Sequence, residues 1–305
     1  MVKKISIIGS GSVGSNLAFC ILSYLDIKDL VLVDIAGTLA EGVALDLEDT
    51  RSFIGFNTNI LGTSNIKHIK DSDIVVITSG IPRKEGMSRL DLFKTNSKIA
   101  IGAADKIKRL APASIIIVVT NPLDLITYVV YKHSHFNRQR VMGMGSSLDS
   151  ARLANLIHKK LKVSVSDISA LVIGPHSKDM IPLDSFVKIK GAALDSFMAQ
   201  EEISVINDKV KLRGKEIVSF LKKKSASFAP ALSCLKLIEA VSKDKNEIIP
   251  VSTLLEGEYG LKDMCIGIPC IINRRGVSKI IEVKLNSSQK KELCKAKKIF
   301  LECMM

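Results

Sequence analysis

At 305 residues the chain is long enough to form two domains of ordinary size, each with a sizeable core. Its 47% hydrophobic and 25% charged residues, with 19 glycines and 8 prolines, exclude collagenous and intrinsically disordered classes. The net charge of +13 is compatible with a nucleic acid, an anionic membrane or an anionic small-molecule substrate. The lysine-rich stretches at 222–224 and 290–298 lack interleaved aromatic residues and nucleic-acid motifs. We therefore interpret them as solvated faces and expect no nucleic-acid partner.

The cysteines and the apolar runs indicate the compartment. The six cysteines form no CxxC motif and no metal-ligand spacing with the five histidines, so free thiols and no metal site are expected. No signal peptide precedes the first apolar run, which begins at Ile5, and no apolar run reaches the roughly 18 residues of a membrane span. We expect a cytoplasmic protein without a membrane partner.

Short apolar runs alternate with longer helical patterns through the first half of the chain. Four runs are predicted to be buried strands: Ile5–Ile8, Leu30–Val33, Ile74–Ile77 and Ile115–Val119. Three intervening stretches have the length and period of crossover helices: Val13–Tyr24, Ala36–Asp49 and Leu90–Leu110. Continuous apolar strands spaced by helices predict an α/β fold with a doubly wound parallel sheet, as in a Rossmann domain.

A domain boundary is predicted at Gly143-Met144-Gly145, which follows a short apolar run and precedes a new helix near Ser147 or Asp149. This divides the chain into residues 1–144 and 145–305. The second part mixes helices at 148–161 and 199–224 with several strand candidates, which is typical of an α+β domain. The strand candidates are Ser169–Ile173, Phe186–Ile189, Ile248–Thr253, Met264–Ile272 and Ile280–Val283.

A glycine-rich turn follows the first predicted strand. Gly9, Gly11 and Gly14 form a GxGxxG motif between a strand and a helix, where backbone amides and the helix dipole favour a pyrophosphate. Asp34 ends the next strand and can accept hydrogen bonds from a ribose diol, but it would repel a 2′-phosphate. The turn therefore predicts NAD rather than NADP. The alternative is a structural turn, with Asp34 only capping the helix after the second strand.

Four further segments carry candidate chemistry: Gly80–Arg89, Thr120-Asn121-Pro122, Ser147–Arg152 and Gly174-Pro175-His176. In this order and spacing they resemble the lactate and malate dehydrogenase family. The resemblance extends from Val2 to about Leu285 and is closest to the lactate-dehydrogenase-like malate dehydrogenases. It implies a Rossmann domain followed by an α+β domain that binds the substrate, NAD as cofactor, and assembly as a homo-oligomer, with a tetramer favoured over a dimer.

The resemblance also implies roles for individual residues. His176 would be the proton donor and acceptor, and Asp149 would orient its imidazole and stabilise the charged form. Arg152 would bind the substrate's C1 carboxylate through a bidentate fork, which a lysine could not match. Arg89 would polarise the carbonyl oxygen, and Asn121 would hydrogen-bond the substrate oxygen or the nicotinamide ribose. The cofactor-binding residues implied are Gly9, Gly11, Ser12, Val13, Gly14, Asp34, Asn96, Val119 and Asn121.

Arg83 lies where lactate dehydrogenases usually carry Gln and malate dehydrogenases carry Arg. A second cation matches the second carboxylate of oxaloacetate, and the loop around it would close over the substrate. The stretch 225–231, with the small Ala226, also resembles the malate pattern. We therefore expect an NAD-dependent malate dehydrogenase that converts oxaloacetate and (S)-malate into each other. An exposed loop charge is the alternative for Arg83.

The histidine segment departs from the family pattern. Where the family usually reads Gly-Gly-His-Gly-Asp, this chain has Pro175 before the histidine and Ser177-Lys178 after it. We expect a differently shaped loop, and a lower pKa of His176 from Lys178 unless Asp179 pairs with that lysine. The alternatives are an L-lactate or other 2-hydroxy acid dehydrogenase, or a protein that binds NAD and a dicarboxylate but turns over slowly.

Overall fold

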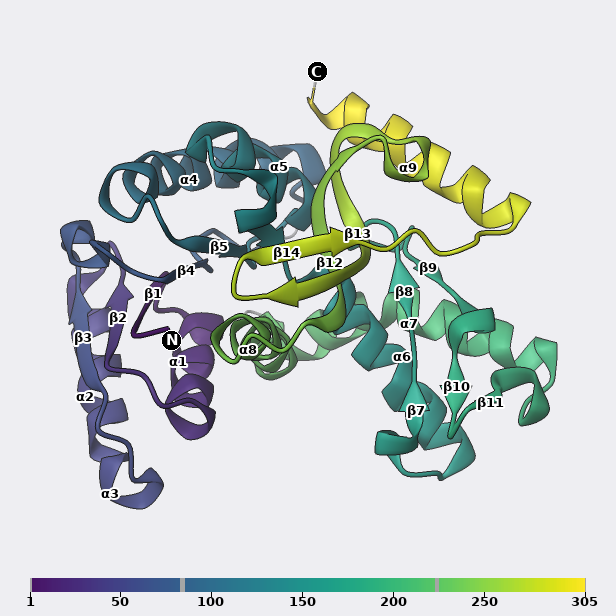
Figure 1. The fold of residues 1–305 in the computed structure, drawn as a ribbon, viewed down its shortest axis with the longest axis horizontal. Coiled ribbons are helices and arrows are strands. Elements are labelled where there is room, and N and C mark those ends of the chain that lie inside the picture. The colour runs from purple at the N-terminus through teal and green to yellow at the C-terminus, as the bar shows by residue number, and fades with distance from the viewer. Residues whose placement is uncertain (1, 83–85, 223–224, 305) are drawn as a thin grey trace.

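The computed structural model describes residues 2–82, 86–222 and 225–304, and it describes Arg89 without its side chain (Figure 1). Its described strands form one large mixed sheet in the order β14-β13-β12-β6-β5-β4-β1-β2-β3, in which the six strands from β6 to β3 run parallel. The parallel strands are β1 (Lys4–Ile8), β2 (Asp29–Val33), β3 (Asn59–Thr63), β4 (Ile74–Ile77), β5 (Ile115–Val118) and β6 (Val141–Gly143). This order confirms the prediction of a doubly wound Rossmann sheet.

Helices cover both faces of the parallel strands, as Figure 1 shows. α4 packs on α5 on one side of the sheet, and α1 packs on α8 on the other. The helices of this half are α1 (Ser12–Tyr24), α2 (Gly37–Asp49), α3 (Arg51–Ile54), α4 (Arg89–Leu110) and α5 (Leu123–Ser134). Because β1, β4 and β5 are parallel neighbours, the segments that follow them meet at one end of the sheet.

The second half of the chain extends the same sheet. β12 (Glu247–Glu256) pairs with β6 through Ser252 and Gly143, and β13 (Lys262–Asn273) and β14 (Gly276–Ile280) follow it as antiparallel neighbours. Two small sheets lie beside it, built from β7 (Ile168–Ser169), β10 (Lys188–Ile189) and β11 (Ala192–Ala193), and from β8 (Val172–Ile173) and β9 (Ile181–Pro182). The remaining helices are α6 (Gly145–Leu161), α7 (Gln200–Leu221), α8 (Phe228–Ser242) and α9 (Ser287–Met304).

Two apolar cores hold these layers together. The larger one surrounds the main sheet and includes Leu293, Ala296 and Phe300 of α9. A smaller core lies between α6, α7 and β10 and includes Leu153 and Val210. The second half is therefore a mixed α and β structure, as predicted; it shares the larger core with the first half and contains the smaller core within residues 153–210.

Several predicted element boundaries were wrong. The strand expected at Ser169–Ile173 is two short strands, β7 and β8, that pair with different partners. The strand expected at Phe186–Ile189 is shortened to β10, because residues 184–186 form a 3₁₀ turn. β14 ends at Ile280. The amide of Ile281 still donates to the carbonyl of Pro269 in β13, but the Tyr259 hydroxyl donates to the carbonyl of Ile281 and accepts from the amide of Val283, so the pairing with β13 does not continue. Helix α6 begins at Gly145, earlier than expected.

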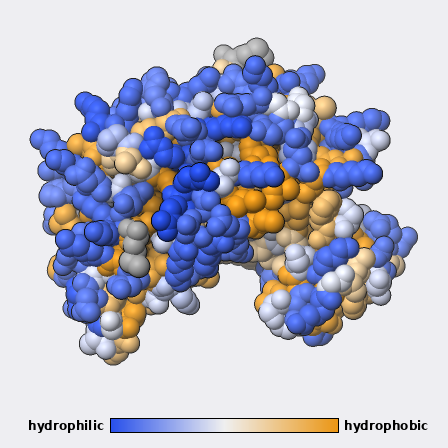
Figure 2. Space-filling view, viewed as in Figure 1, coloured by the Kyte–Doolittle hydropathy of each residue, from blue (hydrophilic) through white to orange (hydrophobic). Residues whose placement is uncertain are grey.

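The surface on the side shown in Figure 2 is mostly hydrophilic, and hydrophobic residues gather in its middle, over the strands β12 and β13. Within the described ranges, we find no helix with both the length and the apolar character needed to cross a membrane.

Candidate active site

The turn between β1 and α1 is shaped by glycines. Gly9 has a φ of +111°, and a Cβ there would lie 2.6 Å from the backbone nitrogen of Ser79. A Cβ on Gly14 would lie 1.9 Å from the carbonyl oxygen of Gly9. A Cβ on Gly11, in contrast, would meet no atom within 4 Å. The first and third glycines therefore allow close packing within the protein, while the second leaves open space beside the start of α1.

This open space has the polar surroundings that a dinucleotide requires. In the described part of the chain no side chain caps α1, so its first backbone amides and the dipole of the helix are available to an anion. The buried hydroxyls of Ser10 and Ser79 have no hydrogen-bond partner among the residues that the structure describes. Asp34 accepts hydrogen bonds from the amides of Ser10 at 2.8 Å and Ala36 at 3.0 Å, which fixes its carboxylate beside the turn. The residues present fit the binding of NAD.

The other predicted cofactor residues lie around the same end of the sheet. Ser12 and Val13 form the first turn of α1, and Val119 is buried directly after β5. Asn121 is exposed in the next turn. Asn96 is buried, and its side-chain amide donates to the carbonyl of Asn121 at 2.7 Å and to that of Ile81 at 3.2 Å. Both N–H groups of Asn96 therefore hold loop backbones together.

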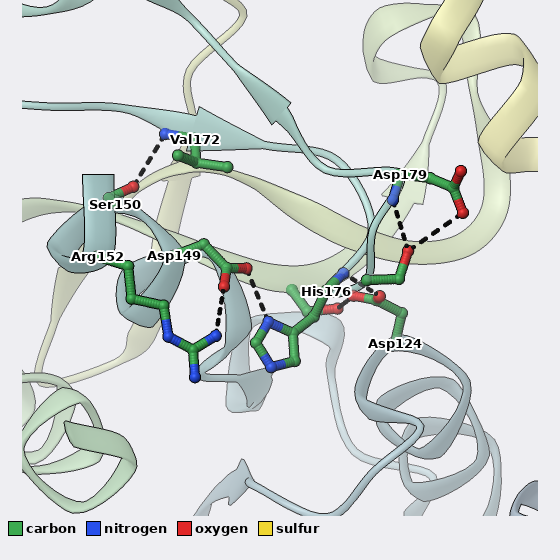
Figure 3. Close-up of polar contacts among 9 residues, drawn as sticks. Asp124, Asp149, Ser150, Arg152, Val172, His176 and Asp179 are labelled. Atoms are coloured by element: carbon green, nitrogen blue, oxygen red, sulfur yellow. Dashed lines mark hydrogen bonds and ion pairs between the residues drawn. The ribbon is translucent and has the colours of Figure 1, made fainter. Parts of the chain in front are cut away.

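A buried cluster of three ionisable residues lies at the junction of the two halves (Figure 3). Asp149 and Arg152 are one turn apart on α6, and His176 follows β8. The imidazole Nδ1 of His176 lies 2.7 Å from one carboxylate oxygen of Asp149, and the Nη1 of Arg152 lies 3.3 Å from the other oxygen. Asp149 is fully buried, so a single carboxylate that no water reaches contacts both cationic groups.

Close backbone approaches bring His176 to α6. A Cβ on Gly145 would lie 2.7 Å from the Cβ of His176, so only glycine lets the histidine segment approach the start of this helix. Gly174, with a φ of +90°, exchanges two backbone hydrogen bonds with Gly267 of β13, at 2.8 and 3.1 Å. The histidine is thus positioned by contacts from α6 and β13 at once.

Asp124 belongs to the site, although the sequence analysis did not single it out. Its carboxylate is buried and accepts hydrogen bonds from the backbone amide of His176 at 2.8 Å and from the Ser252 hydroxyl at 2.7 Å. It therefore links α5, the histidine segment and β12. The signal available in the sequence was the one charged residue inside the mostly apolar stretch 123–130, because a buried carboxylate must have hydrogen-bond partners.

Burial alone would lower the pKa of His176, but the charge of Asp149 and the hydrogen bond to it raise the pKa above its ordinary value. Arg152 lowers this pKa again and Asp124 raises it. The expectation that Lys178 would act on this pKa was wrong, because Lys178 is exposed and is not among the groups that shift it. Ser177 instead accepts a hydrogen bond at 3.1 Å from the amide of Asp179 and so braces the segment from within.

Two predicted site residues are not placed by the structure. Arg83 lies outside the described residues, and so does the side chain of Arg89, whose backbone begins α4. Ser88 caps this helix by accepting a hydrogen bond from the amide of Asp91 at 3.1 Å. Among the residues that the structure describes, no group of three His, Cys, Asp or Glu side chains is placed to hold a metal ion.

Comparison with known proteins agrees with this arrangement. Residues 3–143 match the family model of the lactate/malate dehydrogenase NAD binding domain, and residues 146–304 match that of the α/β C-terminal domain of the same enzymes. The chain belongs to the lactate/malate dehydrogenase family. It is 42% identical over 296 residues to the malate dehydrogenase of Bacillus israeli, covering 96% of this chain and 95% of that protein.

Solved structures of lactate/malate dehydrogenases resemble the whole chain. The malate dehydrogenase of Cryptosporidium parvum is 36% identical, with a TM-score of 0.96 over 99% of this chain and 98% of that one. The lactate dehydrogenase of the same organism, solved with lactic acid and NAD, is 34% identical, with a TM-score of 0.94 over 99% and 97%. The fold therefore does not separate the two branches of the family.

A substitution at Asp124 tests the site while Asp149, Arg152 and His176 themselves stay unchanged. In Asp124→Asn the negative charge that raises the pKa of His176 is lost, so a pH profile governed by protonated His176 should lose activity at a lower pH than in the wild type. The hydrogen bonds from the His176 amide and the Ser252 hydroxyl also lose their charged acceptor, which should reduce the free energy of unfolding by about 1–3 kcal/mol. Steady-state rates across pH and urea denaturation measure the two effects.

Ser252→Ala is the matched control for Asp124→Asn. It removes the hydroxyl that donates to Asp124 but keeps the carboxylate charge. We expect it to reduce stability without moving the pH profile. A profile that moves equally in both variants would mean that Asp124 acts on His176 only through packing.

Proposed function

We propose that this protein is an NAD-dependent malate dehydrogenase that interconverts oxaloacetate and (S)-malate, with His176 as the proton donor and acceptor. The observation that carries the proposal is the buried carboxylate of Asp149, which contacts Nδ1 of His176 and Nη1 of Arg152 together. A proton-transfer group and a carboxylate-binding group are thereby placed side by side. This pairing suits a 2-oxo acid, whose carbonyl and carboxylate are adjacent.

His176 would transfer its proton at Nε2. Its Nδ1 is engaged by Asp149, which leaves Nε2 as the nitrogen that can give or take a proton. The carboxylate fixes the orientation of the ring and stabilises the imidazolium. In the reducing direction the protonated ring would donate to the carbonyl oxygen, and in the oxidising direction the neutral ring would accept the proton of the hydroxyl.

Other residues would bind the charged groups of the substrate. Arg152 would hold the C1 carboxylate through two parallel hydrogen bonds, and Arg89 would stabilise the negative charge that develops on the carbonyl oxygen. Asn121 would hydrogen-bond the substrate oxygen or the nicotinamide ribose. Arg83 would bind the second carboxylate, which distinguishes oxaloacetate from pyruvate.

The turn around Gly11 would hold the pyrophosphate of the cofactor against the start of α1, and Asp34 would accept hydrogen bonds from a ribose. When bound, the nicotinamide supplies the hydride for reduction or takes it up in oxidation. The chain's own groups would exclude water from the site and provide the proton.

A substrate panel tests the proposal. With NADH, the purified protein should oxidise the cofactor much faster with oxaloacetate than with pyruvate or branched 2-oxo acids. Preference for pyruvate or a branched acid would instead support an L-lactate or other 2-hydroxy acid dehydrogenase. Protection against heat unfolding by NAD and a dicarboxylate, without turnover, would identify a binding protein.

We also propose that the chain forms a homo-oligomer in the cytoplasm, with a tetramer favoured over a dimer. Large apolar side chains are exposed on α2, α3 and α7, among them Leu45, Phe53 and Phe220 at 64%, 90% and 78% exposure. Light scattering should give a mass of four or two chains, and a monomer at micromolar concentration would contradict the assignment. Cell fractionation tests the compartment, for which the six free cysteines provide support.

A further inference from the structure

The side chain of Asn96, on α4, hydrogen-bonds both backbone groups of Ile81. Its Oδ1 accepts from the amide of Ile81 at 2.8 Å, and its Nδ2 donates to the carbonyl of the same residue at 3.2 Å. The carboxamide therefore pairs with the segment after β4 much as a neighbouring strand would. Gly80 allows this approach, because a Cβ there would lie 3.1 Å from Oδ1 of Asn96 and 2.6 Å from Cγ2 of Thr120.

The second N–H of the same carboxamide holds the turn after β5. It donates to the carbonyl of Asn121 at 2.7 Å. Within the described residues, this is the one hydrogen bond that the main chain of Asn121 makes. Because Asn121 is exposed and lacks other main-chain hydrogen bonds, its position depends on Asn96.

Asn96 thus joins two turns that meet at the end of the sheet. β4 and β5 are parallel neighbours, and the Thr120 hydroxyl also connects their turns by donating to the carbonyl of Ser79 at 2.8 Å. Asn96 is 1% exposed, and both of its N–H groups are used in this contact. It therefore has no donor left for a cofactor.

We propose that Asn96 is a positioning residue that fixes Asn121 relative to the segment after β4, and that it is not itself a ligand of the cofactor. The inference rests on the proposed function, in which Asn121 hydrogen-bonds the substrate oxygen or the nicotinamide ribose. That hydrogen bond requires Asn121 to be held in place, because a shift of about 1 Å in a substrate-positioning group can lower the rate substantially.

Asn96→Ala removes all three hydrogen bonds. At saturating NADH we expect kcat for oxaloacetate reduction to fall about thirtyfold, because Asn121 is no longer held in place. The Kd for NADH, measured by fluorescence titration, should rise less than about threefold, because the glycine turn and Asp34 are unchanged. A direct ligand of the cofactor would give the reverse result, a raised Kd with kcat retained.

A double variant tests whether Asn96 acts through Asn121. Asn121→Ala alone should lower kcat, because the contact with the substrate or the ribose is lost. Adding Asn96→Ala to it should lower kcat less than about threefold further, since the side chain to be positioned is already absent. A full further thirtyfold loss would overturn the proposal, because Asn96 would then act independently of Asn121.

Two further variants keep the test decisive. Ile107 is a fully buried core residue of the same helix, so Ile107→Val should lower the melting temperature and leave kcat unchanged. If Asn96→Ala does not fold, Asn96→Asp replaces it. Asn96→Asp keeps the size of the side chain and the acceptor for the Ile81 amide but removes both donors, so the same fall in kcat is expected.

The wild type reports on the proposed function, and the variants report on Asn96. A wild type that does not turn over oxaloacetate overturns the function. An active wild type in which Asn96→Ala keeps its kcat, or changes only the Kd for NADH, overturns the role of Asn96 alone.

Discussion

Replacing His176 with asparagine is expected to lower kcat for oxaloacetate reduction about a thousandfold. Asparagine can donate a hydrogen bond to Asp149 but cannot give or take a proton near neutral pH. The 2.7 Å contact with the buried Asp149 engages Nδ1 of the imidazole, so the variant loses the proton transfer that we propose at Nε2. The rate of NADH oxidation measures the loss.

The control for His176→Asn is the affinity for NADH, measured by fluorescence. His176 follows β8 and is not part of the glycine turn between β1 and α1 that would hold the pyrophosphate, so cofactor binding should be retained. Asp149→Asn should lose activity as well, because it removes the charge that favours the imidazolium. A loss of less than tenfold in His176→Asn would show that another group transfers the proton.

The wild-type pH dependence should have opposite signs in the two directions. The pKa of His176 is raised above its ordinary value, because Asp149 outweighs the effect of burial. Reduction needs the protonated ring, so its rate should be high below this raised pKa and fall as the pH rises through it. Oxidation of malate needs the neutral ring, so its rate should rise over the same range.

Replacing Arg83 with glutamine is expected to reduce kcat/KM for oxaloacetate about a hundredfold and to leave pyruvate nearly unaffected or improved. In the variant, the second carboxylate of oxaloacetate would be enclosed without a cationic partner, which costs several kcal/mol. In the wild type, the methyl group of pyruvate would be enclosed beside Arg83, so that the arginine is the unpaired group. Steady-state rates with both substrates measure the ratio. The ratio, rather than either rate, carries the assignment to malate.

Lys84→Gln is the matched control for Arg83→Gln, since it removes a neighbouring charge from the same segment. It should change both substrates slightly and equally. Equal losses for oxaloacetate and pyruvate in Arg83→Gln would contradict the selectivity assignment, because a residue that merely supports the segment would affect both.

Most strands of the parallel half of the sheet could be predicted from the sequence, because a continuous apolar run indicates a strand that is buried on both faces. β1, β2, β4 and β5 lie within a residue or two of the predicted runs. β3 was missed because it alternates exposed and partly buried residues and contains Gly62, which approaches the backbone of α2. The division of residues 169–173 between two sheets depends on partners distant in the sequence, so no local pattern predicted it.

The part of the candidate site that lies in the motifs shared with the family was predicted from the sequence. His176, Asp149 and Arg152 are brought together as expected, while the placement of Arg83 stays a prediction. Asp124 was not anticipated, because its importance comes from contacts across the chain. Asp124 hydrogen-bonds the backbone amide of His176, 52 residues away.

The pairing of β12 with β6 has a consequence for dissecting the chain. The proposed boundary after Met144 separates two family domains, yet β12 pairs with β6 across it, at Ser252 and Gly143. A fragment ending at Met144 would present β6 as a bare edge, with unpaired backbone groups and the apolar side chains of Val141 and Met142. Such a fragment would be prone to aggregate. We therefore expect that the nucleotide-binding half does not fold independently of the second half, although it carries the cofactor site.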